Sequence, residues 1–247
     1  MPRFANGHFS ETVICPMQPS VKLSGDERRA AIIQSVRHLF ANQGFKGTRT
    51  REVAEAAGVS EALLYRHFPT KDALFAAIQE SFCDDRTRAR FARINDLEPS
   101  TKTLILHVHF LVAQILGGPG DGAERPIQNR MILRSLAEDG AFAQVLLQPF
   151  ASMVVPKIAE CCRAAVAAGD AVENPVNENI GGWLVYSLAA AVSFLSTPSM
   201  PVVAFDGLTP SLNRQIAWFA LRGLGLHEEA IRRDYNCAEV LAGLELS

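Results

Sequence analysis

Apolar residues recur along this chain at spacings of three and four, which is the period of an amphipathic helix. No stretch shows the strict alternation of apolar and polar residues that is typical of a strand. The pattern therefore predicts an all-α protein. The predicted helices after the first seventy residues lie at about 71–94, 101–116, 126–138, 141–147, 149–168, 177–196 and 211–224, with one or two short helices within 227–245.

A capping box predicts the start of the first helix. Ser24 can cap the helix with its hydroxyl, and Glu27 can reach back to the backbone of Ser24. Apolar residues then follow on one face, and Gly44 is expected to end the helix. The residues on the apolar face are Ile32, Val36, Leu39 and Phe40.

Two short helices joined by a glycine turn are expected between Thr48 and Lys71. Thr48, Ser60 and Thr70 are suitable N-cap residues for three successive helices. Gly58 can adopt the left-handed conformation that ends the first of them. This pattern predicts a helix-turn-helix, whose second helix enters the major groove of DNA. The residues expected to face inward are Val53, Ala54, Ala57, Leu63, Leu64 and Phe68.

The outward residues of the second short helix have the chemistry of base and phosphate contacts. Arg66 could read a guanine edge, Glu61 could accept from a cytosine amino group, and Ala62 could meet a thymine methyl. Tyr65 and Lys71 could donate to phosphates. His67 is a further phosphate donor, Thr50 and Arg51 are predicted to face the same surface, and Arg49 is predicted to lie near the DNA backbone.

This stretch resembles the TetR family of bacterial one-component regulators. The resemblance runs from about Arg29 to Glu80, through the segments LFANQGFKGT, REVAEAAGVS and LLYRHFPTK. It implies that the DNA contacts include Thr50, Arg51, Glu61, Ala62, Leu63, Tyr65, His67 and Lys71. The alternative is a structural three-helix unit with a solvated basic face.

The resemblance also implies a domain organisation. We expect a flexible N-terminal arm at 1–23, a helix-turn-helix DNA-binding domain at 24–83, and a larger helical effector-binding and dimerisation domain at 84–247. The arm could contact DNA or be a solvated tail. Dimerisation would use the helices at about 178–196 and 211–224, whose small residues would let two backbones approach closely; alternatively, both helices complete a monomer core.

The charge is distributed as a DNA-binding protein requires, although the net charge is −2. Residues 24–95 hold 12 Lys/Arg and 9 Asp/Glu, a balance of +3, whereas residues 96–247 hold 10 and 16, a balance of −6. We expect no membrane-spanning helix and no secretory signal, and hence a cytoplasmic protein. The five cysteines fit no paired metal spacing, so no metal and no cofactor are expected.

The effector is expected to be a small apolar or aromatic molecule, because the candidate pocket residues are mostly apolar. Residues of these types are more often plain core residues. The candidates are His107, Phe110, Gln114, Met153, Trp183 and Tyr186. His107 and His109 are two residues apart on a helix, a poor spacing for zinc.

The sequence thus favours a homodimeric repressor that leaves a palindromic, double-stranded operator when its effector tilts the 71–94 helix. Activation by the same fold, or thiol redox sensing through Cys161 and Cys162, are the alternatives. Enzymatic activity is not expected, since the chain lacks the common nucleophile, zinc-protease and phosphate-loop motifs.

Overall fold

The computed structural model describes residues 24–82, 85–117, 124–173, 176–197, 202–203, 205 and 209–235. The expected arm at 1–23 and the cysteines 15, 83 and 237 lie outside these residues. The helices are α1 (Gly25–Gly47), α2 (Thr50–Ala56), α3 (Glu61–His67), α4 (Lys71–Ser81), α5 (Asp85–Asn95), α6 (Thr101–Leu116), α7 (Glu124–Ala137), α8 (Ala141–Pro149), η1 (Phe150–Val154), α9 (Val155–Ala167), α10 (Glu178–Leu195), α11 (Thr209–Gly223) and α12 (Glu228–Asp234).

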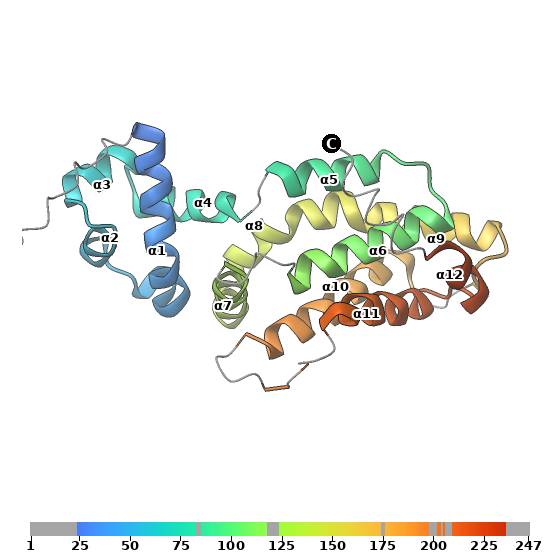
Figure 1. Cartoon of the computed structure of the whole chain (residues 1–247). Helices are drawn as coiled ribbons and strands as arrows, with labels where there is room; N and C mark the ends of the chain where they lie inside the picture. The colour runs from blue at the N-terminus through green and yellow to red at the C-terminus, as the bar shows by residue number, and fades with distance from the viewer. Residues whose placement is uncertain are drawn as a thin grey trace, which may run out of the picture.

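The predicted all-α class is confirmed. Figure 1 shows α1, α2 and α3 at one end of the molecule, the helices from α9 to α12 at the other, and α7 between them. Within the described residues the extended structure is limited to one isolated antiparallel bridge between Ala171 and Leu226.

Most of the predicted capping signals are confirmed. Ser24 and Glu27 form both bonds of the capping box, at 3.2 and 2.8 Å. Ser60 accepts from the backbone N–H of Leu63 at 3.2 Å, and Thr70 accepts from that of Ala73 at 3.0 Å. These bonds satisfy backbone donors that the first turn of a helix leaves free.

Thr48 is not the N-cap of α2, contrary to the sequence prediction. Arg49 occupies that position, and its backbone N–H donates to the Glu52 carboxylate at 2.9 Å. The Thr48 hydroxyl instead donates to the carbonyl of Gly44 at 2.7 Å. Gly44 has φ of +72° within α1, so the helix kinks there and its last turn continues to Gly47.

The single long helix predicted at 71–94 is wrong, because α4 ends at Ser81 and α5 begins at Asp85. The guanidinium of Arg37 holds this junction. It donates to the Ser81 carbonyl at 3.1 Å and lies 4.8 Å from the centre of the Phe82 ring. It also pairs with Glu124 at the start of α7.

The helical run from α8 to α9 is continuous, where the sequence predicted a break before Pro149 and a bend at Pro156. A π-helix, η1, fills the interval, and the N–H of Val155 donates to the carbonyl of Phe150. Pro156 follows directly and has no N–H to donate to the preceding turn, so a wider turn at this point is in keeping with its chemistry.

Among the described residues, one helical run, Ala141–Ala167, is long and apolar enough to span a membrane by length and composition. The sequence interpretation missed it by dividing the run at Pro149. The run packs against α6, α7 and α10. A core helix of a soluble protein passes the same test, so one such run is weak evidence for a membrane span.

Two hydrophobic clusters form the core. The larger one joins α6, η1, α9, α10, α11 and α12. The smaller one belongs to α1–α4, but α7 and α8 contribute to it as well. Ile127, Met131 and Phe142, all at least 95% buried, pack with Val36 and Phe40 of α1. The helix-turn-helix therefore shares its core with helices from much later in the chain.

A polar contact reinforces this shared core at the kink of α1. The Arg134 guanidinium, on α7, donates to the carbonyl of Asn42 at 2.7 Å and to the Glu138 carboxylate at 2.9 Å. A Cβ on Gly44 would lie 2.2 Å from the Nε of Arg134. Gly44 is therefore required both for its backbone angle and for the space that it leaves.

At the other end of the molecule, Asp170 ties α6 to α12. Its carboxylate accepts from the Thr101 hydroxyl at 2.7 Å and from the Arg233 guanidinium at 2.8 and 3.0 Å. These hydrogen bonds, first that from Arg233 and then that from Thr101, lower the pKa of Asp170 below its usual 3.8.

Gly44→Ala should destabilise the protein more than Gly58→Ala. Gly58 also has a positive φ, +64°, but a Cβ there meets nothing within 4 Å. We expect about 1 kcal/mol for Gly58→Ala from backbone strain alone, and roughly 2 kcal/mol for Gly44→Ala, which also displaces Arg134. Urea unfolding measures both values. Equal losses would show that the Arg134 contact contributes nothing.

Asp170→Asn should remove part of the acid sensitivity of folding. The folded-state pKa of Asp170 is lowered, so its stabilising contribution is present above about pH 3.8 and is lost as the pH falls through the folded-state value. We expect the variant to be less stable than wild type at neutral pH, with the difference shrinking in acid. Urea unfolding across pH tests this, with exposed Asp96→Asn as the control. A difference that does not vary with pH would contradict it.

Candidate nucleic-acid interface

The second helix of the predicted helix-turn-helix, α3, is held by one apolar face. Leu64 and the C-cap residue Phe68 are each only 2% exposed and lie in the smaller core with Val53 and Ala54 of α2. The guanidinium of Arg29, on α1, lies 4.7 Å from the centre of the Phe68 ring. The opposite face of α3 is left for solvent or a partner.

The residues predicted to read bases lie on that open face. Glu61, Ala62 and Arg66 are exposed, and Tyr65 is 46% exposed although its ring is large and apolar. Leu63 is half-buried at the edge of the face. The helical period thus separates the core residues of α3 from those predicted to contact DNA.

The other predicted DNA contacts next to α3 differ in exposure and in the hydrogen bonds that their side chains make. Arg49 is exposed, whereas Arg51 donates to Glu55 of its own helix at 2.9 Å. This hydrogen bond is the first cause of a raised pKa at Arg51, which therefore stays protonated. His67 is half-buried with its Nε2 shielded from solvent, so its ring lies less openly than predicted.

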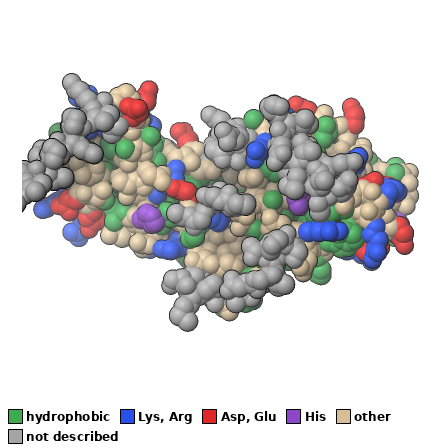
Figure 2. Space-filling view, viewed as in Figure 1, with side chains coloured by type: hydrophobic (Ala, Val, Ile, Leu, Met, Phe, Trp, Pro, Cys, Tyr) green, Lys and Arg blue, Asp and Glu red, His purple; other side chains and the backbone are tan. Residues whose placement is uncertain are grey.

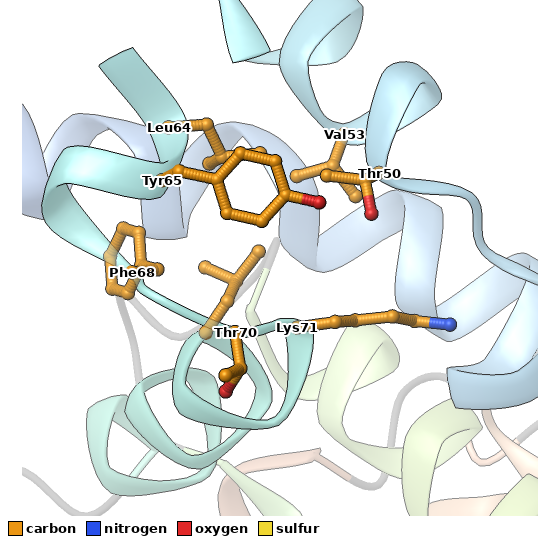
Figure 3. A pocket seen from close by; sticks show the side chains of 8 residues that line it. Thr50, Val53, Leu64, Tyr65, Phe68, Thr70 and Lys71 are labelled. Atoms are coloured by element: carbon orange, nitrogen blue, oxygen red, sulfur yellow. The ribbon is translucent and has the colours of Figure 1, made fainter. Parts of the chain in front are cut away.

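Donors from three helices surround a small hollow beside α3 (Figure 3). Thr50 of α2, Tyr65 of α3 and Lys71 of α4 line it, and the Tyr65 hydroxyl points to the side of Thr50. The hollow is only about 10 Å³, room for a single water molecule. Its rim can donate to a phosphate, but it cannot enclose an organic ligand.

Lys71 is both a candidate phosphate donor and part of the local packing. Its Nζ lies 4.4 Å from the centre of the Phe45 ring, within the range of a cation–π interaction. Lys46, predicted to lie near the DNA backbone, is 3.7 Å from Asp139. In Figure 2, acidic and basic side chains are interspersed at the end that holds the helix-turn-helix, so this view shows no uniformly basic face.

Residues 32–78, which include all of α2 and α3, match the family model described as bacterial regulatory proteins, tetR family. The helix-turn-helix segment of this chain is that of the TetR family. The match confirms the resemblance predicted from the sequence and covers the helix-turn-helix together with most of α1 and α4.

The relatives match only part of this chain. The nucleoid occlusion factor SlmA of Vibrio vulnificus is 37% identical over 95 residues, which are 38% of this chain and 48% of SlmA. The HTH-type transcriptional regulator RutR of Escherichia coli is 38% identical over 73 residues, which are 27% of this chain and 34% of RutR. The matches thus span half or less of each relative.

The fold similarity extends further than the sequence similarity. The crystal structure of AibR in complex with isovaleryl coenzyme A and operator DNA aligns with this chain with a TM-score of 0.54 and 21% sequence identity. The alignment covers 79% of this chain and 96% of AibR. At this identity the comparison shows a common fold and nothing finer.

The six effector candidates lie in separate surroundings. Trp183 and Tyr186 lie with Phe150, at ring distances of 4.9 and 5.3 Å from it. The ring of Phe110 meets that of Phe91 edge to face, with the ring centres 4.6 Å apart, and Met153 is 38% exposed on η1. The remaining two are on α6, where Gln114 is half-buried and His107 is completely buried.

Burial shifts the pKa of His107 and that of Cys161. It lowers the pKa of His107 to about 4, so this ring is neutral at pH 7. It also raises the pKa of the Cys161 thiol, which disfavours the reactive thiolate. Cys162 is half-buried. Among the described residues, no three His, Cys, Asp or Glu side chains lie together as a metal site would require.

Sequence reasoning missed the residues that position the interface from a distance. Arg37 joins the middle of α1 to α7 across 87 residues of sequence, and Arg134 joins the kink near its C-terminal end to α7 across 92. A pattern within one helix carries no signal for such contacts, because the partner is chosen by tertiary packing.

Proposed function

We propose that this chain is a DNA-binding transcription regulator that acts as a homodimer. The observation that carries the proposal is the open face of α3, with Arg66, Tyr65 and Glu61, in a segment that matches the TetR family. The DNA-binding unit would comprise residues 24–83, and residues 84–247 would bind the effector and form the dimer. The protein would work in the cytoplasm, without a membrane partner.

In this proposal α3 enters the major groove of a double-stranded operator. Arg66 would read a guanine and Glu61 a cytosine amino group, with Ala62 and Leu63 giving apolar contact. Tyr65 and Lys71 would bind phosphates at the rim of the small hollow beside α3. Thr50 and the N-terminus of α4 lie at the same hollow and would add further donors. Arg49 and Arg51 would add positive charge near the phosphates. His67 would contact a phosphate only after its ring turned outward.

The dimer is supported by apolar residues that the single chain leaves exposed on α10 and α11. Ile180 and Leu184 are each 52% exposed and Leu195 is 37% exposed, at positions that share one face of α10. Phe219 on α11 is 69% exposed. An apolar stripe of this kind is expected to be covered by a partner.

The small residues of α10 have a different use from the one predicted. Gly181 and Gly182 are buried, and an added Cβ would lie 2.9 Å from Leu224 and 3.2 Å from Val155 of the same chain. They therefore allow close packing within the chain. The proposed dimer rests on the exposed stripe instead, and a two-fold dimer would require a near-palindromic operator.

The regulator would be a repressor released by a small apolar or aromatic effector. The aromatic group of Phe150, Trp183 and Tyr186 beside the π-helix supports a binding site of that chemistry. AibR, which shares the fold, was crystallised with an acyl coenzyme A and operator DNA. The effector would act through its different affinities for two states of the protein.

Because α4 and α5 are separate helices, a rigid 71–94 lever is no longer the proposed route. A shift of α7 or α8 would reach α1 and α4 directly through their shared core. Activation by the same fold remains the alternative. Redox sensing by Cys161 and Cys162 is less well supported, since the raised pKa of Cys161 disfavours its thiolate.

Selection of bound duplexes from a random DNA pool tests the proposed function. We expect enrichment of a near-palindrome, and Arg66→Ala should change the preferred bases within each half-site. No enriched sequence with the folded wild-type protein would overturn the proposal.

Lys71→Gln should weaken binding to all DNA sequences and make it less dependent on salt. Each lost phosphate contact reduces the slope of log K against log salt by about 0.9, and a dimer would lose two such contacts. Fluorescence anisotropy at several salt concentrations measures the slope. Lys102→Gln on α6 removes the same charge far from α3 and should leave the slope unchanged. An unchanged slope for Lys71→Gln would remove this residue from the phosphate contacts.

Leu184→Asp should convert the protein to a monomer, because the carboxylate would be buried without a partner in the proposed interface. Light scattering should give twice the chain mass of 26.9 kDa for wild type and the chain mass for the variant. Leu136→Asp, at a 60% exposed position on α7, is the control and should remain a dimer. A monomeric wild-type protein would contradict the prediction.

A further inference from the structure

A cleft of about 420 Å³ lies between the helix-turn-helix and the helices that complete its core. One wall comes from α1 and α4 and the other from α7 and α8. It is a different place from the aromatic group around Phe150, and it shares no residue with the six effector candidates. Its volume is sufficient for a small organic molecule.

The floor of the cleft is a cluster of phenylalanine rings. The ring of Phe75 lies at its centre, 4.9 Å from Phe45, 5.4 Å from Phe40 and 5.7 Å from Phe142. Phe40 and Phe142 are buried, whereas Phe45 and Phe75 are half-buried and so remain partly open. Aromatic faces attract both apolar groups and cations.

The rim carries an excess of negative charge. Arg134 is engaged by Glu138 at 2.9 Å, and Lys46 faces Asp139 at 3.7 Å. Asp72, exposed in the first turn of α4, adds a third carboxylate to the lining. An anionic ligand would have to displace a carboxylate from Arg134 or Lys46, whereas a cationic ligand would meet Asp72 without breaking either pair.

We propose that this cleft binds a small organic cation with an aromatic or aliphatic body. The apolar part would lie against Phe75, because Lys71 lies over a face of Phe45, and the ammonium group would face Asp72. An occupant would touch both walls and so hold the helix-turn-helix against α7 and α8. The binding itself does not depend on the proposed DNA function.

Calorimetry on the full chain, without DNA, tests the proposal with three probes of one shape. Phenethylamine is cationic at neutral pH, phenethyl alcohol is neutral, and phenylpropionate is anionic. We expect the amine to bind about fivefold more tightly than the alcohol, and the anion to bind most weakly. An anion that binds as tightly as the amine would overturn the proposal, and so would the absence of binding by the amine.

Two variants locate the site. Asp72→Asn should weaken the amine about fivefold and leave the alcohol unchanged. Asp26→Asn is the matched control, because Asp26 is also exposed in the first turn of a capped helix, and it should change neither. Val145→Trp, at a 52% exposed rim position, should weaken all three probes by filling the cleft.

The variants also give the outcomes that refute the site. If Asp72→Asn leaves the preference for the amine intact, the carboxylate does not select the cation. If Val145→Trp leaves amine binding intact, the probe binds elsewhere. Thermal unfolding without probe checks that each variant is folded. Because no DNA is present, failure here leaves the pool-selection test of the proposed function unaffected.

Discussion

The helix-turn-helix depends on a hydrophobic face that it cannot cover by itself. Val36 and Phe40 of α1 are buried against Met131 of α7 and Phe142 of α8 as well as against α4. Burial of apolar surface is the main favourable term in folding, and here part of it joins α1 and α4 to α7 and α8. The direction in which α3 faces is therefore coupled to the position of α7 and α8.

Polar contacts fix the orientation of α1 relative to α4 and α7. Arg37 connects α1 to the end of α4 and the start of α7, and Arg134 connects the kink of α1 to the end of α7. Hydrophobic burial has no direction, whereas a guanidinium holds its partners at fixed angles. A ligand that changes the position of α7 would have to strain or break these contacts, so they are the places where a signal would pass to α3.

Local sequence signals predicted the fold class and the helix-turn-helix well. Capping at Ser24, Ser60 and Thr70 depends on atoms three residues away, so a pattern can carry it. The break after Ser81 and the π-helix at 150–154 were missed, because helical periodicity continues through both. Periodicity reports an apolar face and does not tell whether that face packs within the chain or remains for a partner, so the 69% exposure of Phe219 could not be read from the sequence.

The π-helix at 150–154 has a consequence for how this chain could vary. A π-turn holds one residue more than an α-turn between its hydrogen-bonded groups. Deleting one residue there would restore a regular α-turn, so α8 and α9 would keep nearly the same rotational register. The same deletion within α8, after Phe142, would instead rotate the residues before it by about 100° relative to α9. Phe142 would then leave the core that it shares with α1. The five residues of η1 are thus a place where the chain could lose one residue without turning the helices that hold the helix-turn-helix.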